Sequence, residues 1–244
     1  MPVLALSLLF QIGFAVHAVR TGKDSIWLWI IVFVPGIGCL LYFITQLLPE
    51  ITGSRTLRKA KGRLVETVDP ERELRRCTDL LAAADTVANR LALADQYLAV
   101  GRHDEAIALY QKCLGGVQEN DPGTMEQLAR AYFGKGSAAE ARATLEELMR
   151  VNPRYKSMDG HLLYARVLEA LNDTDAACAE YEILRNTYAG EEARVRYGLL
   201  LQKLGREGQA TQVFDETLTR CKRAPKHYQL KEQEWIRIAE RTSK

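Results

Sequence analysis

Histidines are the residues of this 244-residue chain best suited to acid–base or metal chemistry, and no partner stands at ligand spacing from any of them. They are His17, His103, His161 and His227. The HExxH and GxSxG patterns of metalloproteases and serine hydrolases do not occur. Gly134-Lys-Gly-Ser137 lacks the glycine that a phosphate loop needs five residues before its Gly-Lys pair. We therefore expect no enzymatic activity, no cofactor and no small-molecule substrate.

Cysteines and net charge exclude two further classes of protein. The five cysteines are odd in number and contain no CxxC pair, which argues against a disulfide-stapled secreted domain. Cys113, Cys178 and Cys221 fall on helical positions in or near the expected core, where inert burial is expected. Thirty-three basic and 31 acidic residues give a net charge of +2, so we expect no nucleic-acid partner.

Residues 1–51 differ sharply in composition from the rest of the chain. Thirty-three of them, about 65%, are apolar, and only four are charged. Residues 3–19 and 26–48 form two apolar runs, which as helices would reach roughly 25 and 35 Å. The six-residue polar turn between them predicts a two-helix transmembrane hairpin. The alternative is a cleavable signal peptide, but the chain lacks the basic start that such a peptide needs.

A basic cluster after the second run sets the expected orientation. Residues 52–69 form a juxtamembrane linker containing five basic residues and no acid up to Leu64: Arg55, Arg58, Lys59, Lys61 and Arg63. This cluster outweighs Arg20 and Lys23 in the turn between the two runs. We therefore expect both termini on the cytoplasmic side of a bacterial inner membrane, with the chain held there by residues 3–48.

The second apolar run resembles the N-terminal membrane hairpin that precedes cardiolipin synthases. The resemblance rests on a tryptophan, a proline, a glycine and a tyrosine spaced along the run: Trp29, Pro35, Gly36 and Tyr42. The phospholipase D chemistry of those enzymes needs a lysine two residues after a histidine. Here the residues at that distance are Val19, Glu105, Leu163 and Gln229. The resemblance therefore implies an anchor without the phosphatidyl-transfer site.

From residue 87 the chain repeats itself. A Leu-Ala pair is followed at fixed distances by an aromatic residue, a glycine, an alanine and a second aromatic residue: Leu93-Ala94, Tyr97, Gly101, Ala106 and Tyr110. Three further copies contain the pairs Leu128-Ala129, Tyr164-Ala165 and Tyr197-Gly198. The marker alanines at 106, 141, 177 and 210 are 35, 36 and 33 residues apart. Gly101, Gly136, Asn172 and Gly205 stand where a left-handed residue would turn the chain between helices.

This pattern closely resembles the tetratricopeptide repeat, whose period is 34 residues. The resemblance implies an all-α solenoid over residues 70–244, with repeats at about 87–121, 122–157, 158–190 and 191–224. An amphipathic helix at Glu71–Ala84 precedes them, and Asp85 is expected to cap the helix that follows. Residues 225–241 are expected to form one helix that caps the last repeat.

The resemblance also implies a peptide groove on the concave face. In this family the residues after the Leu-Ala pair point into that face, and here they are Asp95, Arg130, Arg166 and Leu199. Two arginines at equivalent positions would suit the paired oxygens of carboxylates. We expect an acidic peptide with an apolar anchor near Phe133. The alternative is that Arg130 and Arg166 merely pair with Glu126 and Glu169 on their own helices, which is worth about 0.3–0.5 kcal/mol each.

These observations favour a membrane-anchored scaffold that binds a protein partner through its repeats. A narrower alternative is an assembly or quality-control factor for an envelope biosynthetic pathway, because membrane-bound tetratricopeptide proteins of that kind exist. A phospholipid enzyme is a third alternative, suggested by the hairpin alone and opposed by the missing His-x-Lys pattern. The sequence does not identify the pathway.

Overall fold

The computed structural model describes residues 71–242 together with Arg20, Trp29, Ile30, Leu41, Phe43 and Thr45. The predicted membrane hairpin at 3–19 and 26–48 and the linker at 52–69 otherwise lie outside the described residues. No helix among the described residues is both long and apolar enough to span a bilayer. Residues 73–242 belong to one compact unit, which is described below by itself.

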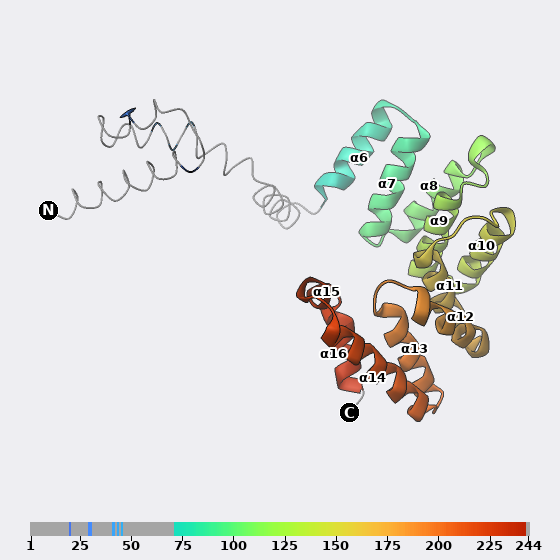
Figure 1. The fold of residues 1–244 in the computed structure, drawn as a ribbon. Coiled ribbons are helices and arrows are strands. Elements are labelled where there is room, and N and C mark those ends of the chain that lie inside the picture. The colour runs from blue at the N-terminus through green and yellow to red at the C-terminus, as the bar shows by residue number, and fades with distance from the viewer. Residues whose placement is uncertain are drawn as a thin grey trace. The chain divides into compact units, whose positions relative to one another are not determined.

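All the regular structure of residues 71–242 is helical, as the repeat pattern predicts (Figure 1). Its elements, in chain order, are α6 (Arg72–Ala83), α7 (Val87–Ala99), α8 (His103–Cys113), the 3-10 turn η2 (Gly116–Gln118), α9 (Pro122–Lys135), α10 (Ala138–Val151), α11 (Met158–Ala170), α12 (Thr174–Thr187), α13 (Glu192–Lys203), α14 (Glu207–Arg223), α15 (Lys226–Lys231) and α16 (Gln233–Thr242).

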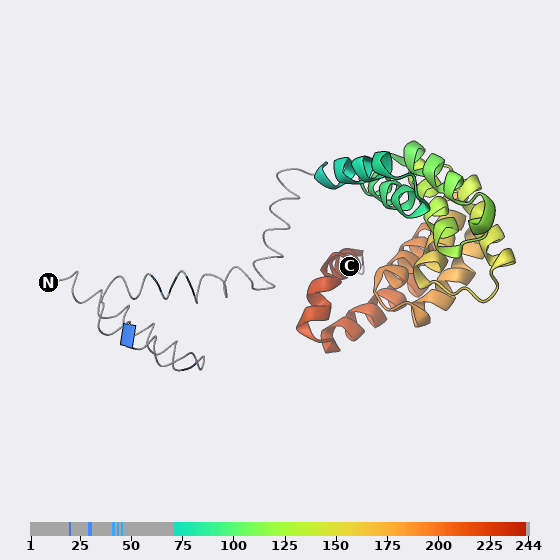
Figure 2. The ribbon, with the colours of Figure 1, turned by 90° about the horizontal axis from the view of Figure 1, so that it is seen from above.

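Eight of these helices pack as four hairpins, α7–α8, α9–α10, α11–α12 and α13–α14, one for each sequence repeat. The first helices of neighbouring hairpins also contact each other, α7 against α9 and α9 against α11. In the described part of the chain the second helices make no comparable contact with one another. The stack is curved (Figure 2). The closer approach of the first helices places them on its concave side.

Left-handed residues make the turn inside each hairpin, as predicted. The backbone φ angles are +76° at Gly101, +90° at Gly136, +58° at Asn172 and +73° at Gly205. An L-residue with a bulky side chain is disfavoured there, and glycine or asparagine is tolerated. The backbone N–H of each of these residues donates to a carbonyl in the last turn of the preceding helix, which ends that helix cleanly.

Side-chain caps begin three of the helices. Thr86 accepts a hydrogen bond from the backbone of Asn89, Asp121 from that of Thr124, and Ser157 from that of Gly160. The prediction that Asp85 caps the helix after α6 was wrong by one residue, because the Thr86 hydroxyl occupies that position. Asp85 instead pairs with Arg90, at 2.5 Å.

The repeat alanines let paired helices approach closely. Ala94, Ala129 and Ala165 are completely buried. Each lies in one apolar cluster with a large buried residue of the second helix, which is Tyr110, Leu145 or Tyr181 in turn. The fourth repeat has Gly198 at this position. A Cβ atom there would lie 2.5 Å from Cε1 of Phe214, so glycine makes room for that ring.

The C-terminal segment differs from the expected single helix. It forms two helices, α15 and α16, separated at Glu232, whose buried carboxylate accepts a hydrogen bond from the backbone N–H of Glu191 at 2.9 Å. This long-range hydrogen bond fixes Glu232 at the break, where the local sequence pattern predicts an uninterrupted helix. α16 packs against α13 and α14 and buries Ala239 in the apolar cluster of the last two repeats, which is the expected capping role.

Candidate functional site

Three arginines lie on the first helices of successive repeats: Arg130 on α9, Arg166 on α11 and Arg196 on α13. We call them the arginine row. Their charges interact, since the positive charges of Arg196 and Arg130 both act on Arg166. The structure therefore brings the two predicted arginines together and adds a third.

Arg166 is the least neutralised member of the row. Its Nη1 lies 3.9 Å from Oε1 of Glu192, and the same oxygen is 2.7 Å from Nε of Arg196. Burial lowers the pKa of the Arg166 guanidinium, and the neighbouring charge of Arg196 lowers it further. By contrast, carboxylate partners raise the pKa values of Arg142 and Arg150. Arg166 thus sits where an additional anion would be stabilised.

Aromatic rings hold two of the guanidinium groups in place. The guanidinium carbon of Arg166 lies 5.1 Å from the ring centroid of Phe133, and that of Arg196 lies 5.0 Å from the centroid of Trp235. Contacts of this length are favourable cation–π interactions. Because the rings pre-position the guanidinium planes, less conformational entropy is lost when an anion binds.

Arg130 combines a bound and an unbound donor. Its Nη2 donates to Oε1 of Glu126 at 2.9 Å, while its buried Nε has no hydrogen-bond partner in the described part of the chain. Glu126 is only 5% exposed, and its other oxygen accepts a bond from the hydroxyl of Tyr155 at 3.0 Å. The expected intrahelical pair Arg130–Glu126 is therefore present.

The second expected intrahelical pair, Arg166 with Glu169, is not formed. The ion pair of Arg166 goes to Glu192 on the next first helix, and Glu169 accepts a hydrogen bond from the buried Tyr181 hydroxyl at 2.9 Å. Arg166 therefore keeps much of its hydrogen-bonding capacity for a ligand. The simple-pairing alternative expects Arg166 to pair with Glu169, whereas the groove interpretation needs Arg166 to be available to a ligand.

The other predicted groove residues have different roles. Asp95 accepts a hydrogen bond from Tyr110 at 2.5 Å, which joins α7 to α8. Leu199 is partly buried against the apolar cluster of the last two repeats and α16, so it contributes to packing. One face of the Phe133 ring carries the Arg166 guanidinium, and the ring packs against an apolar cluster of α9, α10 and α11. The apolar anchor near Phe133 stays a prediction.

Arg196 and Trp235 were missed by sequence reasoning. Arg196 lies three residues before Leu199 and so shares its helix face, which is a signal that the sequence contains. Trp235 lies in the cap, outside the repeat pattern, and no repeat position indicates that its ring meets Arg196.

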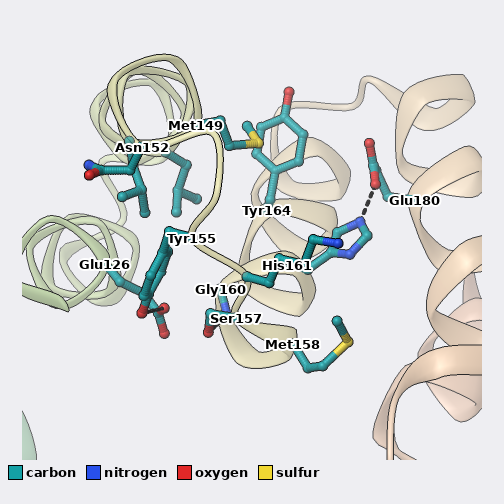
Figure 3. Close-up of a pocket in the computed structure, with 13 residues that line it drawn as sticks. Glu126, Met149, Asn152, Tyr155, Ser157, Met158, Gly160, His161, Tyr164 and Glu180 are labelled. Atoms are coloured by element: carbon teal, nitrogen blue, oxygen red, sulfur yellow. Dashed lines mark hydrogen bonds and ion pairs between the residues drawn. The ribbon is translucent and has the colours of Figure 1, made fainter. Parts of the chain in front are cut away.

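A cavity of about 300 Å³ opens in the seam between the second and third repeats (Figure 3). It is linked to the row through Glu126, which lines the cavity and binds Arg130. We call it the seam pocket. Its walls come from α10, from the connection that follows it and from α11, with Glu180 contributed by α12. The apolar side chains among its lining residues are Leu145, Leu148, Met149, Tyr155, Met158 and Tyr164.

Polar groups lie at both ends of the seam pocket. Glu126, bound by Tyr155, closes one end, and His161 shares a hydrogen bond with Glu180 at the other (Figure 3). The Tyr164 hydroxyl donates to Glu146 at 3.2 Å. Each of these polar groups has a partner within the chain, so the free surface that the pocket offers is chiefly apolar.

The described residues do not assemble a metal site or a reactive thiol. Within residues 71–242 no cluster of three or more histidines, cysteines and acids is placed to hold a metal ion. Burial raises the pKa values of the Cys113 and Cys178 thiols, and it raises that of Cys221 to about 11. These thiols therefore stay protonated at neutral pH.

Comparisons with known proteins agree with this architecture. Models of the tetratricopeptide repeat family match residues 97–158 and 158–182. The search of curated proteins finds no match. A thermophilic tetratricopeptide protein of Thermus thermophilus is similar in structure, with a TM-score of 0.53 and 20% identity over 69% of this chain and 88% of that one. MamA is similar with a TM-score of 0.51 and 22% identity over 60% and 85%. These likenesses show the fold, and the family matches identify tetratricopeptide repeats over residues 97–182.

Proposed function

We propose that the repeats bind an acidic peptide segment of a protein partner along the arginine row. The observation that carries the proposal is the state of Arg166, which is partly buried, flanked by two like charges and 3.9 Å from its nearest carboxylate. A carboxylate from a ligand would supply the missing negative charge. Arginine binds carboxylates through two parallel hydrogen bonds, which adds direction to the attraction.

The placement of the row favours a peptide over a small anion. Three successive repeats each contribute one arginine on the concave side, so an extended or helical segment can meet several of them at once. Tetratricopeptide repeats mediate protein–protein interactions, and the curved stack provides a long continuous surface for such contacts. The function proposed is recognition, with no catalytic step.

Selection from a random 12-residue peptide display library on the purified full chain tests this proposal. The selected pool should be acidic, and the strongest peptide should bind Arg166→Gln about tenfold or more weakly, because a charge-assisted pair is lost. The matched control is Arg150→Gln, since Arg150 is exposed on the second-helix side and pairs with Glu147. A pool without acidic bias, or equal loss in both variants, would refute the proposal.

We also propose that residues 3–48 hold the repeats at the cytoplasmic face of a bacterial inner membrane. The support is sequence composition, namely two apolar runs and the basic cluster after them. A role as an assembly or quality-control factor for an envelope pathway is the narrower form of this proposal. A reporter fused after Lys244 should be active in its cytoplasmic form, and one inserted after Thr21 in its periplasmic form. Periplasmic activity at Lys244 would overturn this orientation.

A further inference from the structure

The seam pocket is an apolar opening that the chain itself leaves unfilled. Met149, Tyr155 and Met158 line it and are 49%, 39% and 41% exposed, which is unusual for side chains of this size. Three large apolar side chains gathered at one opening mark a binding surface rather than scattered surface residues. We infer that the seam pocket receives one large apolar side chain of the same acidic peptide that the arginine row binds. The inference rests on the proposed function and adds the second half of the recognition.

Size favours a single side chain as the occupant. A cavity of about 300 Å³ is at the lower end of the range for ligand sites, where a leucine, methionine or phenylalanine side chain fits better than a cofactor. Two of the walls are methionines, whose flexible thioether side chains adjust to differently shaped apolar groups. The pocket should therefore accept several large apolar residues and reject small polar ones.

Glu126 joins the pocket to the row. Its carboxylate lines the seam pocket, and its two oxygens are bound by Arg130 of the row and by Tyr155 of the pocket wall. Because both oxygens are engaged, Glu126 offers little attraction to a cationic ligand. Lys156 also lines the pocket and forms no ion pair with a described residue, so the uncompensated charge at the pocket is positive. A peptide with an apolar residue in the pocket would thus place its neighbouring residues near Lys156 and, past Glu126, near Arg130, which favours acidic ones.

The seam pocket offers an apolar anchor in addition to the one expected near Phe133. One face of the Phe133 ring meets the Arg166 guanidinium, so an apolar side chain could stack on that face only by displacing the cation. The seam pocket needs no such displacement. Charge recognition and apolar recognition are therefore assigned to separate but adjoining surfaces.

Binding measurements with the selected peptide test this inference. The peptide is labelled with a fluorophore and compared with a version in which its large apolar residue is replaced by serine. The serine version should bind the full chain about tenfold more weakly, as expected for one buried side chain. The variant Met149→Gln with Met158→Gln should lose this difference while keeping its preference for acidic peptides. Both positions are exposed, so the variant should fold.

Ile183→Gln is the matched control, because Ile183 is 53% exposed on α12 and does not line the seam pocket. It should leave both peptide affinities unchanged. Acidic peptides could bind while the Met149→Gln and Met158→Gln variant still prefers the original peptide to its serine version. In that case the pocket assignment is wrong and the proposed function stands. If no acidic peptide is selected, the proposed function itself fails.

Methionine methyl NMR gives a direct readout of the site. The chain has four methionines, and two of them, Met149 and Met158, line the seam pocket. Addition of the selected peptide to the ¹³C-methyl-labelled full chain should shift these two signals and leave that of Met1 in place. Single Met→Leu variants assign the signals. If the Met149 and Met158 signals stay unshifted when the peptide is bound, the inference is overturned.

Discussion

Replacing Glu191 by alanine should loosen the C-terminal end of the helix stack. Glu191 is completely buried, and its carboxylate accepts hydrogen bonds from three elements. Oε1 accepts from Nε of Arg220 at 3.1 Å and from the hydroxyl of Tyr228 at 2.6 Å, and Oε2 accepts from Nη1 of Arg194 at 3.1 Å. One carboxylate thus ties α14 and α15 to the start of α13.

The stability lost in Glu191→Ala depends on which side chains bound to Glu191 stay buried without a carboxylate. Arg220 is about half exposed and can turn to water, and the Tyr228 hydroxyl keeps the carbonyl of Ala189 at 3.0 Å. Arg194 is only 11% exposed, so it would be left as a buried charge without a carboxylate. Breaking a buried pair in this way costs about 3–5 kcal/mol, which should be lost from the stability of the C-terminal helices.

Urea unfolding of the full chain measures this effect through Trp235 fluorescence, in a background in which Trp27 and Trp29 are phenylalanine. The apolar double variant Glu191→Met with Arg194→Met should recover most of the loss, since it removes the Arg194 charge together with its buried partner. Glu147→Ala, which removes an exposed pair with Arg150, is the control and should not shift the midpoint. The reasoning fails if Glu191→Ala behaves like this control, or if the double variant is as unstable as the single one.

Three further predictions concern packing, turns and pH. Gly198→Ala should destabilise the fourth repeat by about 1–3 kcal/mol because its Cβ would meet the Phe214 ring, and adding Phe214→Leu should restore stability in urea unfolding. Gly136→Ala should cost about 1–2 kcal/mol by calorimetry through its positive φ alone, because no atom lies within 4 Å of the added Cβ. Burial raises the pKa of Tyr228 to about 12 and that of Cys221 to about 11. Their protonated forms are favoured in the folded state, so stability should be constant below about pH 9 and should fall as pH rises from 9 to 12. The Tyr228→Phe variant should show a shallower fall in denaturation midpoint over this range, and an unchanged slope would contradict the assignment.

The repeat architecture could be predicted because each repeat contacts chiefly its neighbours. The small residues at Ala94, Ala129, Ala165 and Gly198 and the left-handed turns are local requirements, so a single sequence displays them four times. Local pattern also explains the error at the C-terminus. The break between α15 and α16 depends on the bond from Glu191 to Glu232, which are 41 residues apart.

The candidate site was only half predictable for a similar reason. The position after the repeat pair identified Arg130 and Arg166, but side-chain partners across repeats decide what each arginine is free to do. Glu126 shows the difficulty well. A glutamate one turn from an arginine is typical of an exposed surface pair, yet its side chain is buried between the arginine row and the seam pocket. The pocket itself arises from a connection between repeats, where the repeat pattern specifies no residues.

A charge-swap titration with the selected acidic peptide tests the central claim most directly. Isothermal titration calorimetry of the full chain should show that Arg166→Glu weakens binding by about tenfold or more. A peptide in which the acidic residue facing position 166 is changed to lysine should bind Arg166→Glu better than it binds the unchanged chain. Equal affinities of the two proteins for both peptides would contradict recognition of acidic peptides by the arginine row.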